Sequence, residues 1–337
     1  MSYQSEKILY SFQKLVFDRS GKNIDSVQKL KADASDRKIY RLNSGNKSFI
    51  GIFNENEKEN IAFIKFTEAF LKLGFNVPEI INVADDNLFY IEEDLGDMTL
   101  YRFSQIQDKK LIIDYYKKAL ADLISFQIKA GEEADYNYCY QTAELNGFVL
   151  SEDIKKFREY FLNRFMKDKF SSGEIEKIIE ISAETIKKTD NSFFVYRDFQ
   201  PRNIMLQKEK LFYIDYQSGR KGPLHYDAAS FLYSGSVKLN EDERINLLDY
   251  YESKLSEAVE FDKKEFRHYF YYFAFFRMLQ VLGSYGYIYE KRSDADMLLK
   301  TELALEKIKD IKDKIENKII AEFIGKLTGE KINFIHI

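Results

Sequence analysis

Two aspartates and one asparagine have the residue types and the spacing to hold a divalent ion and to activate a hydroxyl group: Asp198, Asn203 and Asp215. Magnesium prefers oxygen ligands and is commonly held by one or two carboxylates together with substrate phosphates. With Asn203 and Asp215 as metal ligands, the Asp198 carboxylate is left to orient a hydroxyl group and to accept its proton. The three side chains therefore suit magnesium-assisted chemistry on an alcohol.

A short strand and a hairpin would bring these side chains together. The apolar run Phe193–Tyr196 is typical of a buried strand, and it leads Asp198 into a loop that Pro201 keeps from being helical. Two further apolar runs flank a polar turn and predict a β-hairpin, with Asn203 and Asp215 at its open end. The runs are Ile204–Leu206 and Leu211–Ile214, paired so that Leu206 faces Leu211.

The residue order in this segment forms a recognisable motif. Arg197-Asp198 followed by Asn203 resembles the catalytic loop of protein-kinase-like enzymes, with Asp215 in the place of their metal-binding Asp. The closer resemblance is to the aminoglycoside-phosphotransferase family, and within it to the anomeric sugar kinases that phosphorylate N-acetylmuramate and N-acetylglucosamine at C1. Later motifs that carry the resemblance are Asp215-Tyr216-Gln217, Gly222-Pro223 and Tyr226-Asp227-Ala228-Ala229-Ser230.

Without these later motifs, an Asp and an Asn at this spacing would indicate only a polar loop that caps a hairpin. One residue departs from the family pattern, because Tyr196 stands where a His usually precedes the Arg-Asp pair. That His mainly packs and forms hydrogen bonds, so we expect Tyr196 to replace it structurally.

Composition bounds the classes of protein to consider. The chain has 337 residues, enough for one large domain or two lobes, and its net charge of -4 is spread over mixed charges with no basic stripe for nucleic acid. A single cysteine, Cys139, excludes an internal disulfide and favours a reducing cytoplasm. The start shows no signal-peptide pattern, and the apolar stretch Tyr269–Tyr289 contains Arg277 and Gln280, which indicates a buried helix and no membrane span.

The first part of the chain predicts a small α+β unit. Helical spacing covers Ser5–Arg19 and Glu57–Leu73, and the strand candidates are Val27–Leu30, Lys38–Leu42, Ser48–Phe53, Val77–Ile81 and Leu88–Ile91. After Gly96 the pattern turns helical, over 108–130, 151–169, 174–188, 241–260, 263–291 and 294–320. The resemblance implies a bilobal protein-kinase-like fold, with an antiparallel-sheet N-lobe at 1–95 and a helix-rich C-lobe at 96–337.

The expected phosphate-binding residues lie early in the chain. The strand Ser48–Phe53 lacks the lysine that ordinary kinases use on the nucleotide phosphates. We expect Arg37, supported by Lys38 or Arg41, to supply this charge, and the backbone of Ala34 and Ser35 to approach phosphate oxygens. The other interpretation is that these are exposed charges on a β-hairpin.

The segment after the strand at 88–91 resembles the family's hinge between lobes. Adenine would pair with backbone groups near Glu92 and Asp94, whose side chains could equally be solvated or cap the following helix. These residues, with those of the preceding paragraph, form the predicted ATP site.

Only a short segment separates Asp215 from Asp227, which favours a small substrate over a peptide. We expect Asp227 to brace the catalytic loop through Arg197 or backbone N–H groups. Arg277 lies among aromatic residues and would either pair with an acid or reach into the substrate cleft. The expected substrate contacts are Gln200, Gln217, Arg220 and Arg277, with Arg202 neutralising charge on the transferred group.

The sequence therefore predicts an ATP- and Mg²⁺-dependent kinase for the hydroxyl group of a small sugar, with N-acetylmuramate or N-acetylglucosamine implied by the resemblance. Two alternatives remain open. One is a kinase for another small alcohol, such as an aminoglycoside, choline or a pentose. The other is a catalytically silent pseudokinase, suggested by the missing lysine and by the absence of glycines in the segment before Arg37. No oligomeric state is predicted.

Overall fold

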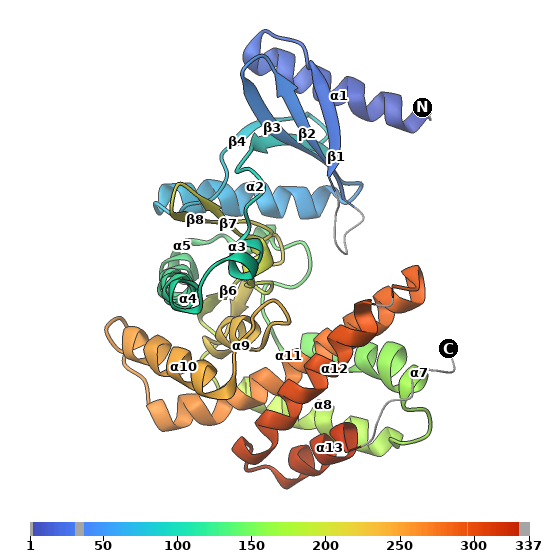
Figure 1. The fold of residues 1–337 in the computed structure, drawn as a ribbon, viewed down its shortest axis with the longest axis vertical. Coiled ribbons are helices and arrows are strands. Elements are labelled where there is room, and N and C mark those ends of the chain that lie inside the picture. The colour runs from blue at the N-terminus through green and yellow to red at the C-terminus, as the bar shows by residue number, and fades with distance from the viewer. Residues whose placement is uncertain (1–2, 31–36, 295, 330–337) are drawn as a thin grey trace. The chain divides into compact units, whose positions relative to one another are not determined.

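The computed structural model describes residues 3–30, 37–294 and 296–329 (Figure 1). The described residues form two compact units. Unit 1 draws on residues 1–106, 133–143 and 202–219, and unit 2 draws on 107–132, 144–201 and 220–337. The hairpin segment 202–219 thus groups with the N-terminal sheet, and the chain enters unit 1 between Pro201 and Arg202. The lobe boundary expected at residue 95 stays a prediction.

Unit 1 contains an antiparallel sheet whose five described strands follow the order β1-β2-β3-β5-β4 (Figure 1). A second, two-stranded ladder is formed by β7 and β8. The elements are α1 (Tyr3–Ser20), β1 (Ser26–Leu30), β2 (Lys38–Ser44), β3 (Lys47–Phe53), α2 (Glu57–Lys72), β4 (Ile80–Val83), β5 (Phe89–Glu93), α3 (Leu100–Ile106), a 3₁₀ turn (Tyr136–Tyr138), β7 (Ile204–Gln207) and β8 (Lys210–Tyr213). The expected strands and helices are present, with ends shifted by a few residues.

Helix α1 packs on one face of the five-stranded sheet. Its Phe12 ring lies 5.5 Å from the ring of Tyr40 and 5.6 Å from that of Phe89. Gly51 in β3 permits this approach, because a Cβ there would lie 2.7 Å from Leu42 and 2.9 Å from Phe12. The sequence signal for this packing was the apolar spacing of the first helix.

The hairpin β7–β8 has the predicted pairing, with Leu206 opposite Leu211. The backbone N–H of Ile214 donates to the carbonyl of Asn203 at 3.1 Å, which confirms that the open end carries Asn203 and Asp215. We expected Pro201 to keep this loop from being helical. That expectation is wrong at one point, because residues Pro201–Asn203 form a single 3₁₀ turn. Proline is tolerated at the first position of such a turn because its missing N–H would have no partner there.

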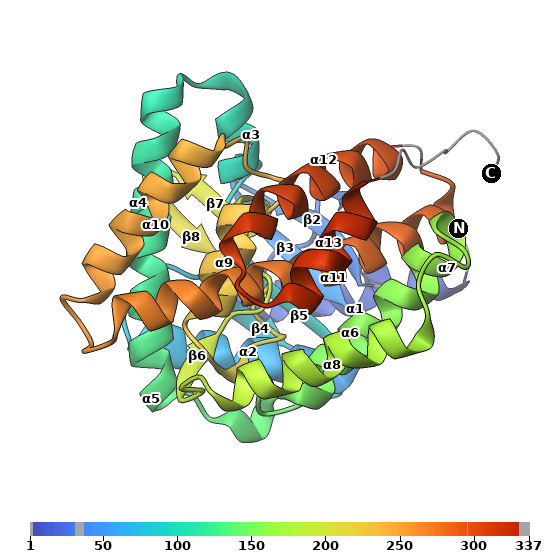
Figure 2. The ribbon, with the colours of Figure 1, turned by 90° about the horizontal axis from the view of Figure 1, so that it is seen from below.

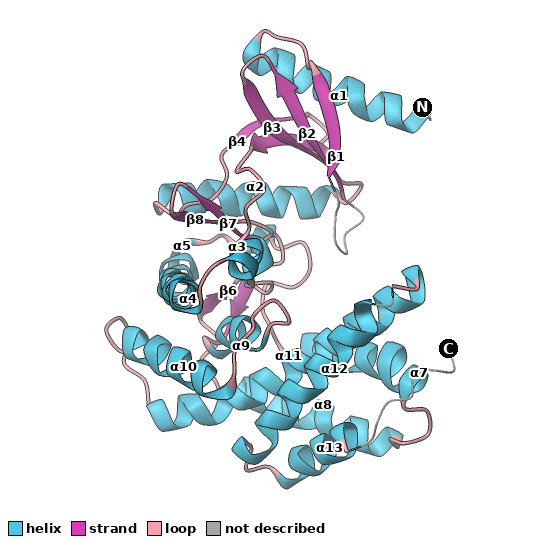
Figure 3. Cartoon of the chain, viewed as in Figure 1, coloured by secondary structure: helices cyan, strands magenta, loops and turns pink. Residues whose placement is uncertain are grey.

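Unit 2 is almost entirely helical, apart from the short pair β6 and β9 (Figure 3). The elements are α4 (Lys109–Ser125), a π-turn (Phe126–Ala130), α5 (Gly131–Glu133, at the unit boundary), α6 (Gly147–Lys156), a π-turn (Phe157–Leu162), α7 (Asn163–Phe165), α8 (Ser172–Lys187), β6 (Phe193–Val195), β9 (Arg220–Gly222), α9 (His225–Tyr233), α10 (Glu241–Leu255), α11 (Lys263–Arg292), α12 (Asp296–Ile311), a 3₁₀ turn (Lys312–Lys314) and α13 (Lys318–Thr328).

Helix α11 forms the core of unit 2. It packs against α9, α12 and the short π-helix Phe157–Leu162, while α6 and α8 lie side by side (Figure 2). Two glycines of α11 permit this π-helix to approach closely. A Cβ at Gly286 would lie 2.3 Å from the carbonyl oxygen of Tyr160, and one at Gly283 would lie 2.8 Å from the amide nitrogen of Phe157. Within the described ranges, no helix is both long enough and apolar enough to cross a bilayer.

The single helix expected over 294–320 is wrong, because α12 ends at Ile311 and α13 begins at Lys318. The Asn317 side chain accepts hydrogen bonds from the backbone N–H groups of Ile319 and Ile320, which starts a new helix. Strand β9 was not predicted, since three residues carry too little pattern.

Candidate active site

The backbone just before Asp198 is hydrogen-bonded to a buried carboxylate of unit 2. Asp227, at the start of α9, accepts hydrogen bonds from the backbone N–H groups of Tyr196 at 2.5 Å and Arg197 at 2.9 Å. Arg197 adopts a φ of 79°, a strained conformation for a residue with a Cβ. Burial raises the pKa of Asp227 to about 7, and the two N–H donors oppose the shift. The expected bracing role of Asp227 is confirmed.

The Arg197 side chain is bonded to two residues of unit 2. Its guanidinium donates to the Tyr226 hydroxyl at 2.6 Å and to the Asp153 carboxylate at 2.7 Å. Tyr196, which stands in place of the family's His, is fully buried. Both residues therefore fix the loop that presents Asp198.

Arg277 on α11 holds the Asp198 carboxylate within unit 2. Its guanidinium donates to Asp198 at 3.2 Å and to the Ser230 hydroxyl at 3.0 Å, and it also bonds Gln280. The Arg277 side chain is 9% exposed, whereas the Asp198 side chain is 35% exposed. Of the two roles left open by the sequence, the structure shows the ion pair with an acid.

In unit 1, the Asp215 carboxylate collects three donors. Asn203 donates to it at 3.3 Å, Gln217 donates at 3.0 Å, and Arg37 forms a short ion pair with it. Burial alone would raise the pKa of Asp215, but Arg37 and these hydrogen bonds hold that pKa below its usual range. The predicted metal ligands Asn203 and Asp215 are thus in direct contact.

Arg37 also lies 3.8 Å from Glu59 on α2, so its guanidinium is placed between two carboxylates. Protein kinases place a lysine beside a glutamate of the corresponding helix to hold the nucleotide phosphates. The other two candidates for this charge are engaged elsewhere, since Lys38 lies over the ring of Phe53 and Arg41 pairs with Asp94. Of the three candidate cations, Arg37 is therefore the one that pairs with Asp215.

The segment after β5 is fixed by Asp94. Its carboxylate accepts hydrogen bonds from Arg41 at 2.6 and 3.0 Å, from the Ser48 hydroxyl at 2.6 Å and from the Gly96 backbone at 2.9 Å. Burial raises the pKa of the neighbouring Glu92 to about 8, and Arg37 opposes that shift. Among the described residues, Glu92 Oε2 has no hydrogen-bond partner.

The remaining candidates are dispersed over both units. In unit 1, the Arg202 guanidinium lies 3.8 Å from the centre of the Tyr101 ring. In unit 2, Gln200 is half-buried in the loop after Asp198, and Arg220 is only 1% exposed, on β9 opposite Val195. Ala34 and Ser35 lie outside the described residues.

The donor set at the hairpin fits a hard cation that keeps ligands from elsewhere. An Asp carboxylate and an Asn amide supply oxygens of the kind that magnesium prefers. Within residues 3–30, 37–294 and 296–329, no group of three or more His, Cys, Asp or Glu residues could hold a metal ion. A magnesium ion here would therefore take its remaining ligands from phosphates and water.

Sequence reasoning missed two acidic residues that orient the site. Glu59 was recognisable in principle, because it follows the strand that lacks lysine and lies in the first turn of the next helix. Asp153 on α6 carried no signal, because its partner Arg197 lies far away in the chain. Only the fold brings those two side chains together.

Comparisons with known proteins show the family and the fold. The pattern of the phosphotransferase enzyme family matches residues 26–262. The chain belongs to this family. The matched range contains the strands of the N-terminal sheet, the hairpin β7–β8 and α9.

Two relatives of this phosphotransferase are each named N-acetylmuramate/N-acetylglucosamine kinase. The protein of Neisseria meningitidis serogroup B is 24% identical over 273 residues, which cover 77% of each chain. The protein of Pseudomonas aeruginosa is 25% identical over 199 residues, which cover 58% of this chain and 56% of that relative's length.

Among solved structures, the choline kinase LicA from Streptococcus pneumoniae superposes with a TM-score of 0.62 at 15% identity, covering 91% of this chain and 99% of LicA. The ADP-bound aminoglycoside phosphotransferase APH(2'')-Ib gives a TM-score of 0.54 at 18% identity, covering 88% and 96%. These likenesses confirm the protein-kinase-like fold.

Proposed function

We propose that this phosphotransferase transfers the γ-phosphate of ATP to the anomeric hydroxyl of N-acetylmuramate or N-acetylglucosamine. The observation that carries the proposal is the fixed presentation of Asp198, whose loop is braced by Asp227 and whose carboxylate is held by Arg277. The names of the two curated relatives support the substrate class.

In the proposed reaction, the C1 hydroxyl oxygen attacks the γ-phosphorus and the bond from that phosphorus to the β-phosphate oxygen breaks, releasing ADP. Asp198 orients the hydroxyl group and accepts its proton. Bound magnesium would supply positive charge to the β- and γ-phosphates, with Asn203 and Asp215 as its protein ligands. Positioning and electrostatics supply most of the rate in such transfers.

Arg37 takes the role of the missing lysine in this proposal. In the structure it pairs with Asp215, and with ATP and a divalent ion it would turn to the phosphate oxygens. Ala34 and Ser35 would add backbone donors, and the backbone near Glu92 and Asp94 would hold adenine. The side chains of Arg41 and Asp94 are already paired, so their contribution is to keep that segment in place.

The charge around Asp198 favours a neutral or anionic acceptor over a cationic one. Arg277 neutralises the Asp198 carboxylate, so a choline or aminoglycoside ammonium group would gain little attraction there. We place Gln200 and Arg202 beside the transferred group. Gln217 and Arg220 would act indirectly, the first through Asp215 and the second by filling the core under the loop.

The test is an ATP-consumption assay with N-acetylmuramate, N-acetylglucosamine, choline, kanamycin and ribose, each with and without magnesium. We expect magnesium-dependent turnover with the two N-acetylated sugars and little with the others. Turnover with choline or kanamycin, and none with either N-acetylated sugar, would contradict the proposed substrate class. Tight ATP binding without turnover on any acceptor would instead support the pseudokinase.

A further inference from the structure

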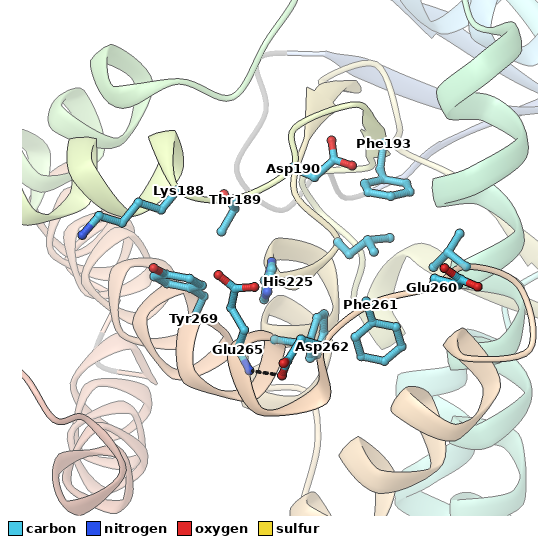
Figure 4. A pocket seen from close by; sticks show the side chains of 13 residues that line it. Lys188, Thr189, Asp190, Phe193, His225, Glu260, Phe261, Asp262, Glu265 and Tyr269 are labelled. Atoms are coloured by element: carbon cyan, nitrogen blue, oxygen red, sulfur yellow. Dashed lines mark hydrogen bonds between the residues drawn. The ribbon is translucent and has the colours of Figure 1, made fainter.

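A pocket in unit 2 lies away from the acceptor site of the proposed reaction. Its volume is about 170 Å³, and it lies between the end of α8, the first residues of β6 and α9, and the start of α11 (Figure 4). Asp198 follows the opposite end of β6. Both ring nitrogens of His225, which lines the pocket, have almost no accessible surface, so a ligand could not bond them. The acceptor must therefore be recognised by groups beside Asp198.

A row of polar side chains on α11 begins at the partner of Asp198. Arg277, Gln280 and Ser284 follow one another at spacings of three and four residues, which places them on one face of the helix. The Arg277 guanidinium donates to Asp198 at 3.2 Å and, through its other terminal nitrogen, to the side-chain oxygen of Gln280. A single guanidinium thus separates the amide of Gln280 from the carboxylate of Asp198.

The contact with Arg277 determines which end of the Gln280 amide is left for a ligand. A guanidinium carries only donors, so the amide atom that faces it must be the oxygen, and the NH₂ group must point away. That nitrogen donates one hydrogen to the Ser284 hydroxyl at 3.3 Å, and the hydroxyl in turn donates to the backbone carbonyl of Gln280 at 3.1 Å. Among the described residues no protein acceptor is found for the second hydrogen, and Gln280 is half-buried. The row therefore offers an N–H donor close to Asp198.

This placement of a donor matches the chemistry of a 2-acetamido sugar. In N-acetylglucosamine and N-acetylmuramate the acetamido group is attached to C2, the carbon next to the one that carries the anomeric hydroxyl. The carbonyl oxygen of that group accepts hydrogen bonds and has no proton to donate. A sugar whose anomeric hydroxyl lies at Asp198 would bring this oxygen to the neighbouring polar group of the protein. Arg277 itself is poorly suited to receive it, because its side chain is only 9% exposed.

We infer that Gln280 selects the 2-acetamido group of the acceptor: its second amide N–H donates to the acetamido carbonyl oxygen while Asp198 accepts the proton of the anomeric hydroxyl. The inference rests on the proposed function and adds a specificity-determining residue to it. Glucose has only a hydroxyl at C2, whose oxygen lies closer to the ring and reaches the amide less well. Glucosamine has an ammonium group there, which sets donors against a donor and offers no oxygen to it.

The experiment uses the full chain and compares kcat/KM for three acceptors, N-acetylglucosamine, glucose and glucosamine, each with ATP and magnesium. Gln280→Leu removes the donor, so the ratio of kcat/KM for N-acetylglucosamine to that for glucose should fall about tenfold. A disturbance of Arg277 would lower kcat/KM for both sugars and would cancel in this ratio. Gln280→Glu keeps the shape of the side chain but presents an oxygen, so the ratio for glucosamine to N-acetylglucosamine should rise about tenfold.

Glu290→Leu is the control, because Glu290 is an exposed residue of the same helix, and both ratios should stay as in the wild type. Wild-type turnover of N-acetylglucosamine together with an unchanged ratio in either Gln280 variant would overturn the inference and leave the proposed function standing. Absence of wild-type turnover with N-acetylglucosamine would also overturn the inference. Absence of turnover with N-acetylmuramate as well would contradict the proposed function itself.

Discussion

The candidate residues of unit 1 and those of unit 2 are held in different ways. In unit 1, Asp215 is held by an ion pair with Arg37 and by side-chain amides, contacts that can be exchanged for a metal ion and phosphates. In unit 2, Asp198 follows Arg197, whose strained backbone is bonded by Asp227, and the Asp198 carboxylate is bonded by the buried Arg277. Both segments contain one residue with a positive φ, Asp215 in unit 1 and Arg197 in unit 2. The difference lies in the partners: in the proposed reaction, the charge pairs of Asp215 would be exchanged for ligands, whereas the buried partners of Asp198 and its loop would stay in place.

The comparison predicts that changes in unit 2 mainly lower kcat. The largest effect is expected for Asp198→Asn, which keeps the shape of the side chain but cannot accept the hydroxyl proton. We expect kcat to fall about a thousandfold, with an unchanged KM for ATP, measured by steady-state ATP consumption. Turnover close to that of the wild type would refute the assignment of Asp198.

Arg277→Met tests whether Arg277 acts through Asp198. We expect kcat to fall about tenfold to a hundredfold, because the carboxylate loses its fixed orientation. In an Asp198→Asn background the same change should cost much less, since the two residues act as one unit. Arg267→Met, on the same helix, is the control. An equal loss in both backgrounds would show that Arg277 is only structural.

In unit 1, Arg37→Met should raise the KM for ATP about tenfold, because the phosphates lose their charged partner. Arg37→Lys should recover part of this loss, and Lys38→Met, which removes a charge directed at Phe53, should have little effect. The expected readout is nucleotide affinity by calorimetry alongside kinetics. An unchanged affinity for ATP in Arg37→Met would remove Arg37 from the phosphate site.

The smallest expected effect concerns stability and pH at Asp227. The pKa of Asp227 is about 7 in the folded protein against an ordinary value of 3.8, so between these values the folded chain binds a proton that the unfolded chain lacks. This contribution to the free energy of unfolding is present at low pH and is lost as the pH rises through the window.

Asp227→Asn, which does not titrate, should therefore be destabilised more at pH 5 than at pH 7.5 relative to the wild type. A loss of about 1–3 kcal/mol is expected from the unpaired backbone N–H. Thermal unfolding at the two pH values measures the difference, and a deficit that is larger at pH 7.5 would have the wrong sign.

The sequence predicted what a local pattern or a family motif carries. The pairing of Leu206 with Leu211 and the bracing by Asp227 followed from apolar spacing and a recognisable motif, and both are present. What it could not predict depends on distant partners. Arg37 meets Glu59 and Asp215, and Arg277 meets Asp198, only after helices and strands are packed, so no local pattern chooses between their alternatives.

The most direct measurement is identification of the product. The purified protein would be incubated with ATP, magnesium and N-acetylmuramate or N-acetylglucosamine, with the matching 1-deoxy sugar, which lacks the anomeric hydroxyl, as the control. ³¹P NMR should show ADP and a sugar phosphate coupled to the anomeric proton, and no product from the 1-deoxy sugar. Phosphate at another position, or equal turnover of the 1-deoxy sugar, would contradict anomeric phosphorylation.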